Sequence, residues 1–309
     1  MFRSFKLCAS FFKGRACKLI LAVLLLFLGG GYFFFRPSSY YFLIPVDSDE
    51  EYWGGVPLFQ IGIEDKSYQV ELDLGTEMST LDQEQLDKVD KTFYGTFVSY
   101  DMRGNSFETP IYEVPQVRIH DLSLLMMKIR GESPEFISSN IFTGSADNRM
   151  CSGRAGRDIF ENRNFLLDFA RSRMILCESF KYLSKSGYHL KDFIKVPLHI
   201  NKIGYCLEVD TDTGVKMLLL DTGCSLSILR EAPSEKQLAL EAVDDAPSWS
   251  TRKLIIGSKD FGPHAFDLCE ISELLSEIDG ILGMDFLRKH AIFFDQDHLL
   301  VYVEKCSAS

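Results

Sequence analysis

One acid in this chain lies in a setting where an acid is costly. Asp221 belongs to an Asp-Thr-Gly tripeptide inside the otherwise apolar segment Met217–Leu229. A carboxylate that leaves water loses several kcal/mol unless it is hydrogen-bonded or has a function. Gly223 permits a tight backbone turn beneath the acid, while Thr222 and Ser225 offer hydroxyls that can bond to it. The segment therefore predicts a strand, a turn that carries the carboxylate, and a second strand.

The same tripeptide occurs earlier in the chain, at Asp212-Thr213-Gly214, in a different setting. It is flanked by two strand-like runs, Tyr205–Val209 and Val215–Leu219. Two such runs joined by a short polar segment with a glycine are typical of a β-hairpin. We therefore interpret this copy as a hairpin turn and keep Asp221 as the candidate for chemistry.

The candidate acid has a counterpart in the first half of the chain. The strand-like run Tyr68–Leu72 leads to Asp73-Leu74-Gly75, which lies opposite Asp221-Thr222-Gly223 in a repeat. Further on, Gly156–Asp168 aligns without a gap with Gly283–Asp295: glycine, acid, apolar pair, polar turn, apolar triplet and acid recur in order. The sequence thus predicts two homologous halves, each of which presents one acid on a glycine turn.

Two carboxyl groups held close together define a specific chemistry. Both cannot ionise easily, so one keeps its proton while the other acts as a base. Such a pair can deprotonate a water molecule for attack on a carbonyl, protonate the carbonyl oxygen, and pass a proton to the leaving amine. This hydrolysis requires neither a metal nor a serine or cysteine nucleophile. We therefore predict a site with no cofactor and no metal.

The chain resembles an aspartic protease of the pepsin/retropepsin clan in a single-chain, two-lobed form. The resemblance rests on Asp221-Thr-Gly-Cys-Ser, Asp73-Leu-Gly-Thr and Ile278–Leu287, and it covers about residues 55–178 and 195–304. It implies a mostly β fold of two homologous, retropepsin-like closed β-barrel lobes with a cleft between them. It also implies an aspartic endopeptidase that acts on a polypeptide substrate, with Asp73 and Asp221 as catalytic residues. The residues expected to support this dyad are Gly75, Thr76, Thr222, Gly223 and Ser225.

Two departures from the family pattern fall in the first half. Leu74 stands where the family has a residue whose hydroxyl bonds across the base of the dyad, so Thr222 lacks a reciprocal partner. An unmade buried hydrogen bond costs about 1–3 kcal/mol. The family's apolar-apolar-glycine segment is intact at Ile281–Gly283 but becomes Arg154–Gly156 in the first half. These departures keep a second hypothesis open, a catalytically degenerate binding or scaffold protein on the same fold.

A long hairpin is predicted at Phe97–Tyr112, with its tip near Met102–Asn105. The turn-forming pair Gly104-Asn105 supports this interpretation. In the family, a hairpin of this kind covers the cleft as a flap, and Tyr100 is the candidate for covering the dyad. The alternative is an ordinary surface hairpin in which Tyr100 has no such role.

The N-terminal segment Leu19–Phe35 is free of charged residues, and five cationic residues precede it. Its length is at the lower limit for a helix that crosses a hydrocarbon core about 30 Å thick. The positive-inside rule places the N-terminus in the cytoplasm and the remaining chain outside it. We favour an uncleaved signal anchor over a cleaved signal peptide, since no small-x-small cleavage site follows the apolar run. The expected location is a single-pass membrane protein with an extracytoplasmic body, in the periplasm, the extracellular space or a lumen.

The predicted organisation follows from these features. Its parts are a cytoplasmic basic segment (1–18), a transmembrane signal anchor (19–35), a linker (36–54), an N-terminal acid-protease lobe (55–178), an interlobe connection (179–194) and a C-terminal acid-protease lobe (195–309). Short helices are expected at Arg157–Arg163 and Met284–His290. The net charge is −11, although the first 46 residues contain no acid. So acidic a body argues against nucleic acid as a partner. With both lobes in one chain, a monomer is expected to be the active form.

Cysteine and histidine usage is less informative. The cysteines expected outside the cytoplasm are Cys151, Cys177, Cys206, Cys224, Cys269 and Cys306. They could form three disulfides, but their spacing does not fix a pairing, and none has zinc-ligand spacing. Cys224 is expected to be a small core residue whose pKa is raised by its neighbour Asp221. His290 and His298 are expected on the surface.

Overall fold

The computed structural model describes residues 40–47, 56–100, 104–133, 151–230 and 248–305. The part from Tyr41 onward forms one compact unit. The predicted transmembrane segment 19–35, the hairpin tip at residues 101–103 and most of the polar loop after Arg230 lie outside the described residues. Within the described ranges, no helix is both long and apolar enough to cross a membrane.

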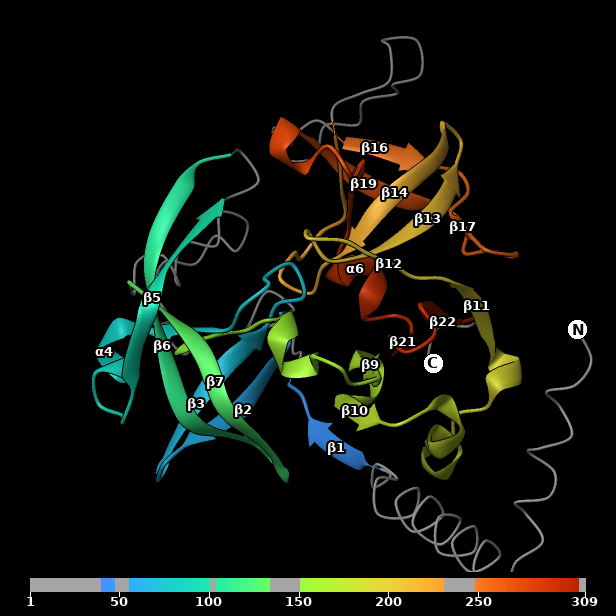
Figure 1. Ribbon diagram of the computed structural model, residues 1–309. Helices are drawn as coiled ribbons and strands as arrows, with labels where there is room; N and C mark the ends of the chain where they lie inside the picture. Colours follow the sequence, from blue (N-terminus) through green and yellow to red (C-terminus); the bar gives the residue numbers. More distant parts are fainter. Residues whose placement is uncertain (1–39, 48–55, 101–103, 134–150, 231–247, 306–309) are drawn as a thin grey trace, which may run out of the picture. The chain divides into compact units, whose positions relative to one another are not determined.

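The first half of the chain builds a seven-stranded sheet in the order β2-β3-β8-β4-β7-β6-β5 (Figure 1). Its strands are β2 (Leu58–Ile63), β3 (Lys66–Leu72), β4 (Thr80–Asp82), β5 (Thr92–Tyr100), β6 (Ser106–Ile119), β7 (Leu122–Glu132) and β8 (Gly153–Ala155). β2 pairs with β3 and also with β6, through Gly62 and Arg118, so six of the strands close into a ring. The predicted hairpin is confirmed as β5 and β6, which are longer than expected.

The second half builds a nine-stranded sheet along the path β16-β19-β15-β20-β14-β13-β17-β18, with β12 paired to β13. Its strands are β12 (His199–Ile200), β13 (Tyr205–Thr211), β14 (Gly214–Leu220), β15 (Ile228–Arg230), β16 (Ser248–Thr251), β17 (Ile255–Ile256), β18 (Lys259–Asp260), β19 (His264–Cys269) and β20 (Gly280–Leu282). Among the described strands of this sheet, no pairing closes a ring. The copy at Asp212-Thr213 is the turn between β13 and β14, as predicted.

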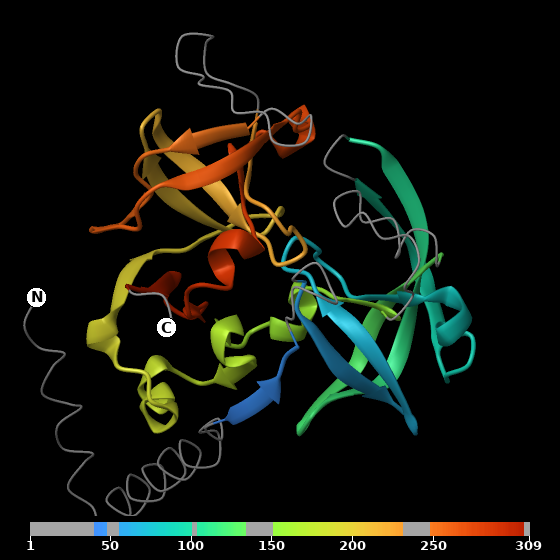
Figure 2. The same ribbon diagram turned by 180° about the vertical axis from the view of Figure 1, so that it is seen from behind.

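A third sheet, of six strands, takes three from each half in the order β1-β10-β9-β21-β22-β11. Its strands are β1 (Tyr41–Pro45), β9 (Phe165–Asp168), β10 (Arg173–Cys177), β11 (Phe193–Pro197), β21 (Ile292–Asp295) and β22 (Leu300–Glu304). β9 and β21 are buried along their whole length and pair antiparallel, and Phe165 stacks on Phe294 with ring centroids 4.4 Å apart. Figure 2 shows the same arrangement from behind, with β1 beside β10.

The helices within the described ranges are short. They are α4 (Gln83–Leu86), η1 (Arg157–Phe160), η2 (Phe169–Arg171), η3 (Phe180–Ser186), η4 (Leu190–Asp192), η5 (Glu273–Leu275) and α6 (Met284–Leu287), where η marks a 3-10 helix. η1 and α6 match the two predicted helices, although both are shorter. η3 and η4 lie in the connection between the halves.

The sequence repeat is also a repeat of topology. β3 pairs parallel with β8 just as β14 pairs parallel with β20, and the register places Leu72 opposite Ala155 and Leu220 opposite Leu282. β8 and β20 then lead into η1 and α6. The two acids therefore follow equivalent strands in equivalent positions. The five described body cysteines are all free thiols.

Candidate active site

The two candidate acids lie on matching turns. Asp73 follows β3 directly and Asp221 follows β14 directly. The N–H of Gly75 donates to Asp73 Oδ1 at 2.9 Å, and the N–H of Gly223 donates to Asp221 Oδ1 at the same distance. In each turn the glycine amide thus holds the carboxylate two residues before it.

The turns also face each other. The N–H of Gly75 donates to Asp221 Oδ1 at 3.0 Å, so one amide contacts both carboxyl groups. A Cβ atom on Gly75 would lie 2.5 Å from Asp221 Oδ2, and one on Gly223 would lie 2.7 Å from the Asp73 carboxyl carbon. Glycine is therefore needed at both positions because the opposite acid lies too close for any side chain.

Thr222 crosses from one turn to the other. Its hydroxyl accepts a hydrogen bond from the N–H of Leu74 at 3.0 Å and donates one to the carbonyl of Leu72 at 2.6 Å. Thr222 and Leu74 are both fully buried. A leucine side chain can neither donate nor accept a hydrogen bond. Thr222 of the second turn therefore bonds to the backbone of the first turn, while the side chain of Leu74 returns no hydrogen bond to the second turn. The sequence comparison predicted this asymmetry.

A second pair of residues supports the turns from behind. Ser79 donates to Asp158 at 2.7 Å and accepts from the N–H of Gly156. In the second half, Ser227 donates to Asp285 at 2.7 Å and accepts from the N–H of Gly283 in the same manner. In the sequence these two acids stand out only as matching positions of the repeat. Ser79 and Ser227 each lie six residues after the candidate acid, and that spacing is the signal that could have identified them.

The halves differ most at one cross-strand pair. In the second half, Leu219 on β14 lies opposite Ile281 on β20, and both belong to an apolar cluster. In the first half, the equivalent positions hold Glu71 on β3 and Arg154 on β8. Nε of Arg154 lies 3.6 Å from Glu71 Oε2. An ion pair thus replaces an apolar pair at the same place in the repeat.

Arg154 also approaches the candidate dyad. Its Nε lies 3.9 Å from Asp73 Oδ2, and its Nη1 lies 3.9 Å from Glu132 Oε2. Glu132 is paired in turn with Arg130 at 3.3 Å, and both are at least 95% buried. Charges act strongly on one another where water is excluded. The first half therefore places a buried cation beside Asp73, whereas the equivalent cross-strand pair of the second half, Leu219 and Ile281, is apolar.

The charge of Asp73 and burial both act on the carboxyl group of Asp221. Burial raises the pKa of Asp221 to about 8, and the negative charge of Asp73 and a hydrogen bond between the two side chains act in the same direction. At neutral pH the pair therefore shares one proton. Burial raises the pKa of the neighbouring Cys224 thiol, with a further contribution from the charge of Asp221. Cys224 is a buried thiol rather than a nucleophile, as predicted.

The other predicted site residues lie near the turns but act differently. Thr76 contacts Asp73 through its backbone N–H, at 3.1 Å. The carbonyl of Ser225 accepts from the N–H of Asp285 at 3.1 Å, so its described contact supports α6. Tyr100 ends β5 with 57% of its surface exposed, and its contact with the dyad stays a prediction.

A serine, a histidine and an aspartate also meet behind the second turn. Nε2 of His264 lies 2.9 Å from Ser227 Oγ and 3.3 Å from Asp285. This group is unsuited to nucleophilic catalysis, because Ser227 is 1% exposed and its hydroxyl proton is directed to Asp285. Across the described ranges, no cluster of three or more histidine, cysteine or acidic residues could hold a metal ion.

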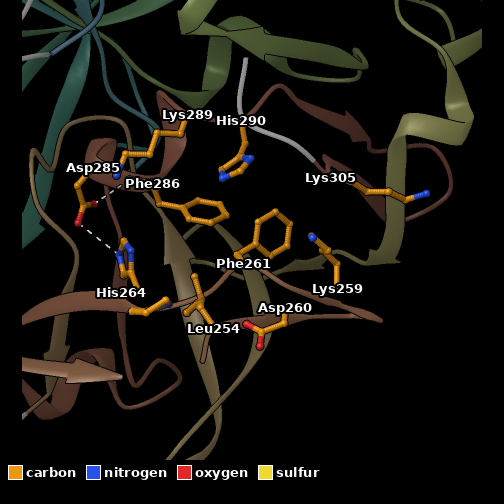
Figure 3. Close-up of a pocket in the computed structure, with 11 residues that line it drawn as sticks. Leu254, Lys259, Asp260, Phe261, His264, Asp285, Phe286, Lys289, His290 and Lys305 are labelled. Carbon is orange, nitrogen blue, oxygen red and sulfur yellow. Dashed lines mark hydrogen bonds and ion pairs between the residues drawn. The ribbon is translucent and has the colours of Figure 1, made fainter. Parts of the chain in front are cut away.

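The two predicted surface histidines differ. His298 is exposed, as expected. His290 is only 7% exposed, so the prediction is wrong for it. Its ring packs against Phe286, four residues earlier, at 4.7 Å and against Phe261 at 4.9 Å between centroids (Figure 3). Phe261 comes from a separate part of the chain, and the sequence does not reveal it as a neighbour.

Comparison with known proteins identifies the fold. No protein-family model and no curated protein sequence matches the chain. The solved structures that match across 87% of it include basic 7S globulin from soybean (TM-score 0.58, 12% identity, 96% of that chain), conglutin gamma, a basic 7S globulin from lupine seeds (0.58, 13%, 96%), and an aspartic proteinase from Irpex lacteus (0.54, 11%, 98%).

At these identities the likeness concerns the fold alone. The chain has a pepsin-like fold, mostly β with barrel-like sheets. That fold occurs here in one protein named as a proteinase and in two named as globulins. The choice between an enzyme and a binding protein therefore depends on the residues of the site.

Proposed function

We propose that the chain is an aspartic endopeptidase in which Asp73 and Asp221 activate water against a peptide bond. The observation that carries this proposal is the amide of Gly75, which bonds to both carboxyl groups at 2.9 and 3.0 Å. Two acids on facing turns, with one proton between them, are the requirement of this chemistry. The mechanism uses no cofactor and no metal.

The surroundings of the acids support different roles for them. Asp221, whose pKa is raised to about 8, is the acid. Asp73, beside the guanidinium of Arg154, carries the negative charge and is the base. Asp73 takes a proton from water as the oxygen attacks the carbonyl carbon, and Asp221 protonates the carbonyl oxygen. When the C–N bond breaks, Asp73 returns its proton to the amine nitrogen and Asp221 recovers its own from the collapsing diol.

The test uses the full-length chain and an unfolded protein substrate between pH 3 and pH 8. Asp73→Asn and Asp221→Asn are each expected to abolish cleavage, because the asparagine amide cannot take up or give a proton as the carboxyl group does. Asp212→Asn is the matched control, since it changes the same tripeptide in a hairpin turn. Cleavage that survives Asp221→Asn would overturn the proposal, as would equal losses in Asp221→Asn and Asp212→Asn.

A second candidate is a non-catalytic binding or scaffold protein on the same fold. Two observations favour it: Leu74 has no hydroxyl to return the hydrogen bonds of Thr222, and the ion pair of Glu71 and Arg154 stands where the other half is apolar. A wild-type chain that cleaves nothing while Leu74→Thr gains activity would establish this alternative. Cleavage by the wild type would exclude it.

The proposed location is a membrane, with residues 19–35 as an anchor and the body outside the cytoplasm. Support comes from the uncharged run and the cations before it. The full-length chain is expected to stay with membranes during extraction at alkaline pH and to be released when residues 1–36 are removed. Release of the full-length chain by alkali would contradict the proposal. Because each half supplies one acid, the proposed active form is a monomer.

A further inference from the structure

Arg157 is the first residue of η1, and it bonds to the turn that carries Asp73. Its backbone N–H donates to the carbonyl of Thr76 at 2.9 Å, and its side-chain Nε donates to the same oxygen at 3.4 Å. The N–H of Thr76 donates in turn to Asp73 Oδ1 at 3.1 Å. Arg157 therefore holds, through its backbone and its side chain, a residue that bonds directly to one of the two candidate carboxylates.

The second half repeats the backbone contact of Arg157 but has a different side chain there. Met284 occupies the equivalent position in the repeat, and its N–H donates to the carbonyl of Cys224 at 2.8 Å. Met284 is fully buried, and its thioether has no hydrogen to donate. The turn geometry therefore does not require an arginine at this position, and the guanidinium of Arg157 is an addition found in the first half.

The guanidinium of Arg157 reaches the loop between β12 and β13, in the second half of the chain. Its Nη2 donates to the carbonyl of Lys202 at 3.2 Å. A Cβ atom on Gly204 would lie 3.2 Å from its Nη1. The loop has a defined shape, because the side-chain oxygen of Asn201 accepts from the N–H of Ile203 at 2.9 Å and from the N–H of Gly204 at 3.0 Å. Arg157 thus contacts a loop that its own hydrogen bonds hold in place.

The same loop packs against the strand that leads to Asp221. A Cβ atom on Gly204 would lie 2.6 Å from a methyl carbon of Leu219, which stands on β14 two residues before the acid. The guanidinium carbon of Arg157 also lies 6.0 Å from the centre of the ring of Tyr205, which is 4% exposed. Coupling between two groups is carried by such continuous chains of contacts. The contacts run without a break from one acidic turn, through Arg157, to the strand that carries the other acid.

We propose that Arg157 is a positioning residue for the dyad: its guanidinium connects the turn of Asp73 to the second half and so sets the distance between the two carboxyl groups. This inference rests on the proposed peptidase function. Arg157 acts through Thr76 and the loop at Lys202, without touching the reacting atoms. An arginine suits this role because its donors form a rigid planar fork, so that one side chain bonds to two carbonyls in different directions.

The first test is Arg157→Met in the full-length chain, which gives the first half the side chain that the second half has. The kcat for an unfolded protein substrate is expected to fall roughly tenfold, the factor that one charge-assisted hydrogen bond is worth. KM should change less than about twofold, since misplaced catalytic groups slow the chemical step rather than weaken binding. Arg157→Lys should give an intermediate kcat, because its donors lie on a single nitrogen and cannot span both carbonyls.

Arg163→Met is the matched control. It makes the same chemical change six residues further along the chain, where the guanidinium donates to the carbonyl of Glu161, two residues before it. Its kcat and KM should equal those of the wild type. An equal fall of kcat in Arg163→Met and Arg157→Met would overturn the proposal, because a local contact would then matter as much as the connection between the halves.

Two further measurements do not depend on activity. The charge of Asp73 adds to burial in raising the pKa of Asp221, so a wider separation in Arg157→Met should lower that pKa in an NMR titration of the carboxyl carbon. The N–H of Gly75, which bonds to both carboxyl groups, should exchange faster with deuterated water. If Arg157→Met does not fold, as judged by circular dichroism, Arg157→Lys supplies the same two measurements.

These measurements separate the two proposals. A folded Arg157 variant with the Asp221 titration and the Gly75 exchange of the wild type would refute the positioning role, even in a chain that cleaves its substrate. A wild type that cleaves nothing would refute the peptidase function, whereas a lowered pKa and faster exchange in the variant would still establish that Arg157 sets the distance between the acids.

Discussion

The guanidinium of Arg154 lies 3.9 Å from the carboxylate of Asp73, at the register position that Ile281 occupies in the other half. The two acidic turns therefore share a backbone but not an environment. The base of one turn contains a buried ion pair, and the base of the other contains an apolar contact. On the Asp221 side, burial disfavours the charged carboxylate and raises its pKa.

The buried ion pair should behave as a unit when it is mutated. Arg154→Ile alone is expected to lower the free energy of unfolding by about 3–5 kcal/mol, because it removes the cation that faces buried Glu71. Combining it with Glu71→Leu recreates the apolar pair of the second half and should recover most of that loss.

Urea unfolding of the wild type, both single variants and the double variant measures the coupling as a double-mutant cycle. Arg252→Gln is the control, because Arg252 pairs with Asp212 at an exposed position and should cost less than about 1 kcal/mol. Additive losses in the double variant would show that Glu71 and Arg154 do not stabilise each other.

The raised pKa of Asp221 predicts a pH-dependent stability. In the unfolded chain an aspartate titrates near pH 3.9, whereas folded Asp221 keeps its proton to about pH 8. Between these values the folded state binds more protons than the unfolded state, so stability from this group falls as the pH rises from about 4 to about 8 and then levels. Asp221→Asn should remove this component.

The measurement is urea unfolding at intervals from pH 4 to pH 9, with the Asp221→Asn curve subtracted from that of the wild type. Subtraction cancels other titrating groups, such as Asp158, whose pKa burial raises to about 6. A difference that rises with pH across this window would contradict the assignment of the proton to Asp221. The proposed peptidase activity should fall above pH 8 for the same reason.

The sequence was sufficient to identify the repeat, because glycine and acid positions recur at fixed spacing in both halves. Asp73 and Asp221 could be paired on that basis. The second Asp-Thr-Gly copy, at Asp212, could be excluded as a catalytic candidate because its flanking sequence indicates a hairpin turn. Leu74 could be recognised as a departure from the family pattern, because the family has a hydroxyl at this position that bonds across the base of the dyad. Local patterns of this kind survive in a single sequence, since the turn geometry fixes which residue types fit.

Contacts between distant strands were not predictable in the same way. In the sequence, Arg154 could be recognised only as a poor match to the apolar-apolar-glycine segment. The sequence of one strand does not show which side chain of the neighbouring strand lies opposite a given residue. Its partner Glu71 gave no signal at all until the register was known.

The two hydrogen bonds that the Thr222 hydroxyl makes to the first turn lead to a further prediction. Thr222→Val keeps the shape but leaves the N–H of Leu74 and the carbonyl of Leu72 without that partner in a fully buried place. A loss of about 2–3 kcal/mol in the free energy of unfolding is expected, since unsatisfied buried groups carry their full desolvation cost. Thr213→Val changes the same tripeptide in the hairpin turn and should cost less than about 1 kcal/mol. Equal losses in the two variants would show that the interlobe hydrogen bonds contribute nothing particular.

The close approach of the two turns predicts that even a methyl group is not tolerated there. In Gly75→Ala the new Cβ would lie 2.5 Å from Asp221 Oδ2, so one turn must move away from the other. Peptidase activity should fall by about 100-fold, because displacement of catalytic groups by about 1 Å has effects of that size. Separation of the carboxyl groups should also lower the pKa of Asp221 toward its ordinary value, which NMR titration of the carboxyl carbon measures even in a chain without activity. Gly95→Ala is the control, since a Cβ there meets nothing within 4 Å. An unchanged pKa of Asp221 in Gly75→Ala would mean that the turns are not in contact.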